Sequence, residues 1–257
     1  MDLTHTADRL RMTTRTTPTR MDEGKLDGRS FRIVRRILLI ILTPLLHLRI
    51  EGLEHVPKTG PVLVVANHLH NGDPIILSVA LPRPLHYMAK KELFSIPIVR
   101  PIIRKVGAFP VDRGKADRSA IRHAEAVLAD GIAVGMFPEG TRSITRALRK
   151  AHPGAGLLAV RSGCPVLPAV ITGSERLPGN GAKAKRQDDQ PEPQSGHRGV
   201  RVRFGPPFTI PREVDGAKVS VDQATDQMMR RLATMLPPDY RGEYASQTDN
   251  DLTPDAH

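Results

Sequence analysis

Residues 61–74 read PVLVVANHLHNGDP, and this stretch decides the expected fold. Its first half, Pro61 to Ala66, is an uninterrupted valine-rich run, which is typical of a strand buried on both faces of a sheet. Its second half is a polar loop that begins where the strand ends. Ligands of open α/β sheets gather beyond the carboxyl ends of the strands, so this loop is the first candidate for a functional site.

The loop holds a histidine and an aspartate five positions apart, in the pattern His-x4-Asp. A carboxylate bonded to one ring nitrogen of His68 fixes the tautomer, and the other nitrogen can then take a proton from a hydroxyl group. Asp73 and Pro74 equally suit the start of a helix, with Asp73 as the N-cap, so a structural role fits them as well. His70 competes with His68 as the base, and the five-residue offset to Asp73 favours His68.

Length and charge bound the class of protein. The chain has 257 residues, enough for one large α/β domain, and its formal net charge is +11 at pH 7. A basic chain favours polyanionic partners such as nucleic acid, an anionic lipid surface or phosphorylated substrates. Aromatic residues for base stacking are scarce, so we expect no nucleic-acid partner. The single cysteine, Cys164, excludes an internal disulfide, and no cluster has metal-ligand spacing, so we expect no metal.

The N-terminal region suggests contact with a membrane surface. The first thirty residues are polar and basic and lack the apolar core of a secretory signal. No segment reaches the roughly 20 apolar residues that span a bilayer. From Arg29 to Leu48, however, arginines lead into a short apolar run, which favours an amphipathic helix at the membrane interface. A core helix with a solvated basic start is the alternative.

Downstream, apolar runs alternate with segments of helical spacing. This alternation predicts an α/β class protein, a single domain with a mostly parallel central sheet flanked by helices, plus the N-terminal amphipathic membrane-interface helix. The expected division is a disordered basic tail (1–28), the interfacial helix (29–50), the main domain (51–240) with a flexible insertion (183–198), and a disordered tail (241–257).

Polar residues follow three of the predicted strands, at His68 to Asp73, at Asp112-Arg113 and at Glu139 to Arg142. Parallel strands point their carboxyl ends the same way, so we expect these groups to share one crevice. The forked guanidinium of an arginine matches a phosphate group well, and Lys90 adds a further positive charge. A base beside a phosphate clamp suits the activation of a hydroxyl group on a phosphorylated substrate.

With these residues in place, the sequence resembles the glycerophosphate and lysophosphatidic acid acyltransferase family. Four family blocks occur in order: NHLHNGD (67–73), GAFPVDR (107–113), FPEGTRS (137–143) and VLPAVITG (166–173), with AKKELF (89–94) as a matching spacer. The sequence departs from the family where many members carry Phe-Lys-x-Gly after the third block. Here the nearest match is AHPG (151–154), which puts His152 in the place of the lysine.

The resemblance implies an enzyme that moves a fatty acyl group from acyl-CoA or acyl carrier protein to the free hydroxyl of lysophosphatidic acid. The product would be phosphatidic acid, in phospholipid biosynthesis. It implies that His68 is the general base, that Asp73 orients it, and that transfer is direct, without a covalent acyl-enzyme. It also implies a set of acceptor-binding residues: Lys90, Arg113, Glu139, Gly140, Thr141 and Arg142.

The resemblance further implies no cofactor beyond the acyl-CoA or acyl carrier protein co-substrate. It implies a peripheral or monotopic protein at the cytoplasmic face of the cell membrane, whose partners are an anionic membrane surface, a lysophospholipid acceptor and the acyl donor. Another lysolipid or glycerol 3-phosphate stays open as the acceptor. Two alternatives belong to other classes: a catalytically silent lipid-binding protein and a basic nucleic-acid-binding protein. The joint presence of His68, Asp73, Glu139 and Arg142 argues against the first, and the four family blocks and the scarcity of aromatic residues argue against the second.

Overall fold

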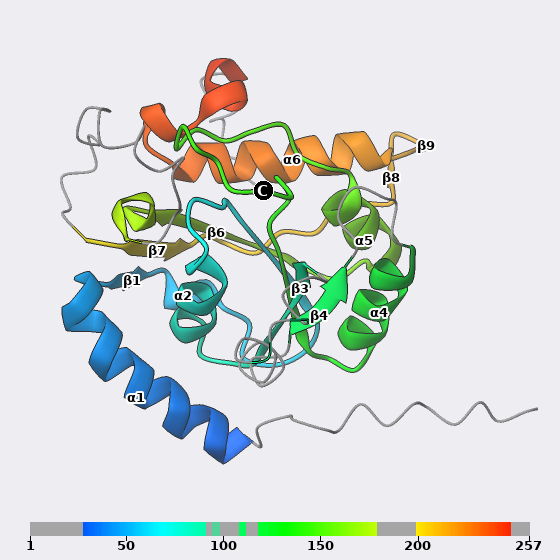
Figure 1. The fold of residues 1–257 in the computed structure, drawn as a ribbon. Helices are drawn as coiled ribbons and strands as arrows, with labels where there is room; N and C mark the ends of the chain where they lie inside the picture. The colour runs from blue at the N-terminus through cyan, green and yellow to red at the C-terminus, as the bar shows by residue number, and fades with distance from the viewer. Residues whose placement is uncertain are drawn as a thin grey trace, which may run out of the picture.

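A seven-stranded sheet forms the centre of the computed structural model, which describes residues 28–90, 95, 97, 108–111, 118–178 and 199–247 (Figure 1). The strand order is β1-β7-β6-β2-β5-β3-β4. Strands β6, β2, β5, β3 and β4 run parallel, whereas β7 is antiparallel to β6 and β1 is parallel to β7. The prediction of an α/β domain with a mostly parallel sheet is confirmed. The strands are β1 (Arg49–Glu51), β2 (Val62–Ala66), β3 (Leu85–Lys90), β4 (Ala108–Val111), β5 (Ala133–Met136), β6 (Val166–Thr172) and β7 (Arg201–Phe204).

Strand β2 lies in the middle of the sheet, between β6 and β5. Its side chains alternate between two apolar clusters: Leu63 and Val65 pack into one, and Val62, Val64 and Ala66 into the other. None of the five is exposed to solvent. Burial on both faces explains why this strand reads as a continuous apolar run instead of an alternating one.

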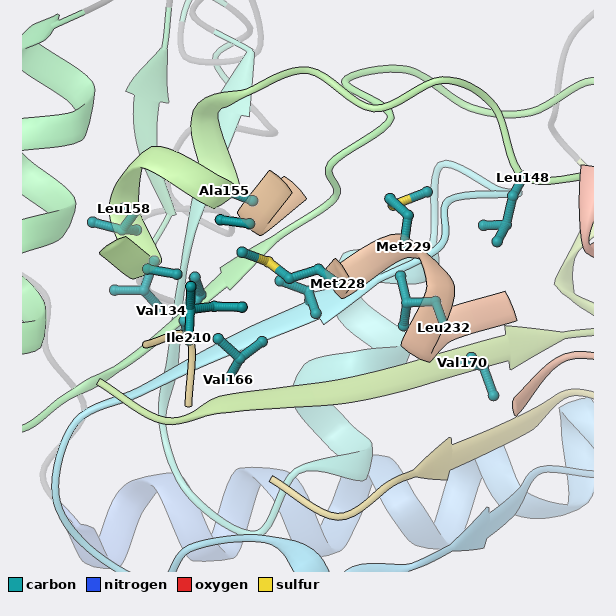
Figure 2. Packing of buried hydrophobic residues seen from close by; sticks show 14 of the residues in the cluster. Val134, Leu148, Ala155, Leu158, Val166, Val170, Ile210, Met228, Met229 and Leu232 are labelled. Atoms are coloured by element: carbon teal, nitrogen blue, oxygen red, sulfur yellow. The ribbon is translucent and has the colours of Figure 1, made fainter. Parts of the chain in front are cut away.

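Helices α4 (Arg118–Ala129), α5 (Gly154–Ser162) and α6 (Val221–Met235) supply the first cluster. Figure 2 shows Met228 of α6 and Leu158 of α5 converging with Val134 and Val166 of the sheet. A capping box formed by Ser220 and Gln223 fixes the start of α6. Helices α5 and α6 approach closely at Gly156, where a Cβ atom would overlap the Thr225 side chain. A glycine is therefore required at this contact.

Helices α1 (Gly28–Leu46) and α2 (Asp73–Ala80) lie on the opposite side of the sheet (Figure 1). Arg35 of α1 donates to the carbonyl of Leu81 at 2.9 Å and to that of Ala80 at 3.1 Å. These carbonyls stand at the C-terminus of α2, where a helix favours a positive charge. Leu39 and Leu46 pack against the second apolar cluster, so α1 is held by both polar and apolar contacts.

The outer face of α1 is apolar and exposed. Between 51 and 68% of the side chain of each residue in the following set is accessible to solvent: Ile33, Ile37, Ile40, Ile41 and Leu45. Their spacing places them on one side of the helix. The helix is shorter than the expected range of 29–50, because the chain turns after Leu46 and enters β1. Within the described ranges, no helix combines the length and apolar character needed to cross a bilayer.

The remaining described elements are short. A hairpin forms from β8 (Glu213–Val214) and β9 (Ala217–Lys218), and 3-10 turns are found at η1 (Leu53–His55), η3 (Ser174–Arg176), η5 (Pro238–Tyr240) and η6 (Gly242–Gln247). Residues 242–247 correct the expectation of a disordered tail from 241 onward. Burial of Tyr244 against the first cluster supplies the reason for their order. The predicted N-terminal tail up to residue 27 and the predicted insertion at 183–198 lie outside the described residues.

Candidate active site

The loop after β2 folds around the carboxylate of Asp73, the first residue of α2. Asp73 Oδ2 accepts three hydrogen bonds: from His68 Nδ1 at 3.0 Å and from the backbone N–H groups of Leu69 and His70 at 2.6 Å each. Asp73 is fully buried. Gly72, not Asp73, is the N-cap of α2, because the Gly72 carbonyl accepts the first helical hydrogen bond, from the Ile76 N–H at 2.9 Å. The aspartate side chain instead points back into the loop. The carboxylate therefore organises the loop as well as the histidine.

His68 is oriented from two sides. Its ring stacks on Phe137 with 4.4 Å between the ring centroids, and its Nδ1 faces the Asp73 carboxylate. Because the carboxylate can only accept, Nδ1 carries the hydrogen and Nε2 is the basic nitrogen. A fixed tautomer with a carboxylate behind it is the arrangement that a general base needs.

His70 has a different environment. Its Nδ1 accepts from the backbone N–H of Gly72 at 2.9 Å, and its Nε2 donates to the Pro178 carbonyl at 3.2 Å. Both ring nitrogens are thus bonded to backbone groups. Of the two competing histidines, His68 is the one that pairs with Asp73.

Glu139 connects the loop after β5 to the loop after β2. Its Oε1 accepts from the backbone N–H of His68 at 2.9 Å, and its Oε2 accepts from that of Arg149 at 3.0 Å. Burial raises the pKa of Glu139 to about 7, although these two backbone N–H groups act in the opposite direction. Both carboxylate oxygens are thus engaged by the protein backbone. The predicted contact of Glu139 with the acceptor stays a prediction.

The rest of the third sequence block forms the turn beside His68. Gly140 has a positive φ of 65°, and a Cβ atom there would lie 2.5 Å from Cδ2 of His152. Thr141 is exposed and Arg142 is half-buried. Ser143 then donates its backbone N–H to the His68 carbonyl at 2.7 Å. Arg142 therefore directly precedes a residue that is bonded to the predicted base.

The two other predicted phosphate ligands are Lys90 and Arg113. Lys90 is the last residue of β3 and is in register with Val111 of β4. It therefore lies at the carboxyl ends of the parallel strands, as His68 does. The side chain of Lys90 and the whole of Arg113 lie outside the described residues. Within the described part, no three side chains of the ligand types His, Cys, Asp and Glu gather as a metal site would require.

Asn67 is a site residue for which the sequence analysis predicts no role. Its side chain donates to the Ile171 carbonyl at 2.8 Å and accepts from the Ile171 N–H at 2.7 Å. This paired bond fixes the end of β2 to β6 immediately before His68. His152, which stands in the place of the lysine that many family members carry, also adjoins the site: its ring lies against Gly140, and its backbone N–H donates to the Pro138 carbonyl at 2.8 Å. For Asn67, the only sequence signal is its position directly before His68.

Fold and site together define a class of protein. A buried His-Asp pair at the carboxyl edge of a mostly parallel sheet is the arrangement of an α/β enzyme that activates a hydroxyl group. Comparison with known proteins makes this class more specific. A model of the Acyltransferase family matches residues 47–172. The chain belongs to this acyltransferase family.

Relatives and a solved structure agree with this membership. The 1-acyl-sn-glycerol-3-phosphate acyltransferase of Bacillus subtilis (strain 168) is 33% identical over 144 residues, which cover 56% of this chain and 71% of that protein. The enzyme of the same name from Borreliella burgdorferi is 30% identical over 124 residues, which cover 48% of this chain and 50% of that protein. The chain thus spans only half the length of the second relative.

The fold has a solved counterpart. The crystal structure of the 1-acyl-sn-glycerophosphate (LPA) acyltransferase PlsC from Thermotoga maritima superposes with a TM-score of 0.59. The match covers 79% of this chain and 78% of that chain, at 24% sequence identity. At this identity, the likeness establishes the shared fold.

Proposed function

We propose that this protein transfers a fatty acyl group from acyl-CoA or acyl carrier protein to the free hydroxyl of lysophosphatidic acid, which yields phosphatidic acid. The observation that carries the proposal is the 3.0 Å bond between His68 Nδ1 and Asp73 Oδ2. The names of the two bacterial relatives support the choice of acceptor.

In the proposed reaction, Nε2 of His68 removes the proton of the acceptor hydroxyl as its oxygen attacks the thioester carbonyl. The new C–O bond forms, the C–S bond breaks, and the imidazolium returns its proton to the departing thiolate. Asp73 stabilises the imidazolium throughout, because its buried carboxylate faces the protonated Nδ1. No covalent acyl-enzyme is needed, since the acceptor hydroxyl is itself the nucleophile.

Arg142 is proposed to bind the phosphate of the acceptor, together with Lys90, Arg113 and the backbone of the Gly140-Thr141 turn. The turn that carries Arg142 is bonded to His68 through Ser143, so a phosphate held there would lie on the same side of the molecule as the base. A guanidinium group suits this task, because it can donate two parallel hydrogen bonds to one phosphate.

The protein is further proposed to work at the cytoplasmic face of the cell membrane, with α1 lying in the interface. Two observations support the placement of α1 in the interface. Ile37, Ile40 and Leu45 expose an apolar face, and Arg29 and Arg32 are exposed near the start of the same helix. Such a helix binds an anionic lipid surface through both apolar burial and charge. Both proposed substrates carry acyl chains, which fits a reaction at that surface.

The experiment measures transfer of a radiolabelled acyl group to lysophosphatidic acid in detergent micelles, from acyl-CoA and from acyl carrier protein in parallel. We expect turnover by the wild type and a loss of about 10²–10⁴-fold in His68→Ala. His55→Ala is the matched control. His55 lies in η1, which follows β1, and β1 runs antiparallel to β2. The end of β1 is therefore at the opposite edge of the sheet from the end of β2, where His68 lies.

Each outcome has a distinct meaning. A His68→Ala variant as active as the wild type would refute the assigned base. A wild type that ignores lysophosphatidic acid but acylates glycerol 3-phosphate or another lysolipid would keep the reaction and change the acceptor. A wild type that is inactive with every acceptor and donor would refute the proposed function.

A further inference from the structure

The segment after α6 packs on the loop that follows Arg142. We name residues 238–247 the C-terminal clasp and residues 143–150 the phosphate-side loop. The Tyr240 carbonyl accepts from the Leu148 N–H at 2.8 Å, and the Leu148 carbonyl accepts from the Glu243 N–H at 3.4 Å. Glu243 Oε1 also accepts from the Lys150 N–H at 3.1 Å. The clasp therefore binds the phosphate-side loop through backbone groups of the loop.

The fit between the two segments is close. Gly242 has a positive φ of 53°, and a Cβ atom at this position would overlap the Leu148 carbonyl oxygen. Any larger residue would push the clasp away from the loop. The two backbones thus touch without an intervening side chain.

Tyr240 also reaches a third segment. Its side chain is fully buried, and its hydroxyl donates to Glu175 Oε1 at 2.7 Å. Glu175 is 4% exposed and lies in η3, directly after β6. Burial and the nearby negative charge of Glu175 raise the pKa of Tyr240 far above its ordinary value, so the hydroxyl remains a donor. One tyrosine thus links the loops that follow β5 and β6.

The phosphate-side loop also contacts the ring of Tyr240. The guanidinium carbon of Arg146 lies 5.9 Å from the centre of the Tyr240 ring, within the range of a cation–π contact. Arg146 is buried and has a positive φ of 66°, a conformation that costs energy for any residue with a side chain. The surrounding contacts must hold this strained position, and the cation–π contact with Tyr240 is one of them.

The other side of the loop is tied to the predicted base. Ser143 donates to the His68 carbonyl at 2.7 Å, and Arg149 donates to Glu139 Oε2 at 3.0 Å. The phosphate-side loop is thus bonded both to the site, through His68 and Glu139, and to the clasp. Arg142 directly precedes Ser143, so these two sets of bonds together set the backbone from which Arg142 projects.

We propose that Tyr240 is a positioning residue, which acts through Glu175 and the phosphate-side loop to fix Arg142 for the phosphate of the acceptor. This inference rests on the proposed function, because Arg142 is the proposed phosphate ligand. Neither Tyr240 nor Glu175 lies within residues 47–172, the stretch that the family model matches. The two residues that carry this role thus lie outside the match to the family model.

The test is Tyr240→Phe, which keeps the ring and removes the hydroxyl. We expect the KM for lysophosphatidic acid to rise about tenfold, because one hydrogen bond to a buried charge is lost. The KM for acyl-CoA and kcat should change by less than about twofold, because the His68-Asp73 pair is untouched. Thr225→Val is the matched control, since it removes a buried hydroxyl of α6 that bonds to Val221 within the helix.

A double variant with Glu175→Gln tests the shared bond. If Tyr240 acts through Glu175, the KM of the double variant for lysophosphatidic acid should be no higher than the larger of the two single-variant KM values. Additive effects would overturn the coupling. An unchanged KM for the acceptor in Tyr240→Phe, or an equal rise in Thr225→Val, would overturn the positioning role.

Failure of the proposed function is distinguishable from failure of this inference. If the wild type does not acylate lysophosphatidic acid, amide hydrogen exchange of the phosphate-side loop tests the clasp directly. Tyr240→Phe should then speed exchange of the Leu148 and Lys150 amides by more than about tenfold, whereas Thr225→Val should not. Unchanged exchange in Tyr240→Phe would overturn the inference.

Discussion

Glu139 holds the backbone N–H of His68 at 2.9 Å through one carboxylate oxygen, and the other oxygen holds Arg149. A carboxyl group thus supports the backbone of the predicted base without touching its ring. The support is sensitive to pH, because burial raises the pKa of Glu139 from 4.5 to about 7.

The first prediction follows from this raised pKa. Between pH 4.5 and about 7 the unfolded chain has lost the Glu139 proton while the folded chain keeps it, so stability falls as pH rises through this window. The loss is on the order of 3 kcal/mol and is complete above about pH 7. Urea unfolding at pH 5 and pH 8 measures it, and Glu139→Gln should reduce the difference between the two conditions. An equal difference in both proteins would contradict the assignment.

The second prediction concerns the charge behind His68. Asp73→Asn keeps the size of the side chain and one oxygen for the loop, but it removes the negative charge that stabilises the imidazolium. We expect kcat to fall by about 10²–10⁴-fold, with both KM values nearly unchanged. Steady-state kinetics at pH 7 provide the measurement, and circular dichroism checks the fold. A wild-type kcat would mean that Asp73 only shapes the loop.

The third prediction separates the two histidines of the loop. His70→Ala leaves the His68-Asp73 pair intact, so kcat should stay within about tenfold of the wild type. Stability should drop by about 1–3 kcal/mol, because the two part-buried hydrogen bonds that His70 makes with the backbone of Gly72 and Pro178 are lost. Kinetics and urea unfolding of the same preparation test both statements. A kcat as low as that of His68→Ala would contradict the assignment of the base.

The fourth prediction concerns the exposed face of α1. The double variant Ile37→Asp with Ile40→Asp places two charges where the bilayer is proposed to lie, and both positions are already exposed. Cosedimentation with anionic vesicles should weaken by more than about tenfold, while the thermal midpoint stays unchanged. Val214→Asp, in the β8-β9 hairpin, is the control, because Val214 is 50% exposed and lies outside α1. Equal binding by the wild type and the double variant would refute the interfacial role.

Much of the fold follows from local sequence. The apolar run that ends at Ala66 matches β2, because burial acts over a few residues. The helical spacing of Ile121, Ala124, Val127 and Leu128 likewise predicts a helix, and α4 forms there. The pairing of β1 with β7 had no such signal, since it joins segments far apart in the chain. The alternation of apolar and basic residues in β7 does predict a strand, but it does not specify the strand with which β7 pairs.

The site likewise has features that local sequence predicts and features that depend on distant parts of the chain. The His68-Asp73 pair was predictable, because a helix start fixes the geometry across five residues. The bond from Asn67 to Ile171 and that from Tyr240 to Glu175 were not, because each depends on the relative placement of distant strands. The polar composition from residue 241 onward predicts a tail, and the burial of Tyr244 distinguishes residues 242–247 from one.

The sheet topology also constrains the order of events during synthesis. Glu51 of β1 bonds to Arg203 of β7, which is 152 positions later in the chain. On a ribosome that emits about 5–20 residues per second, β1 has no partner strand for many seconds after it appears. Throughout that interval the apolar face of α1 is already outside the ribosome, next to an unfinished sheet edge. Cotranslational capture of α1 by a lipid surface would therefore precede closure of the sheet and shield this segment from aggregation.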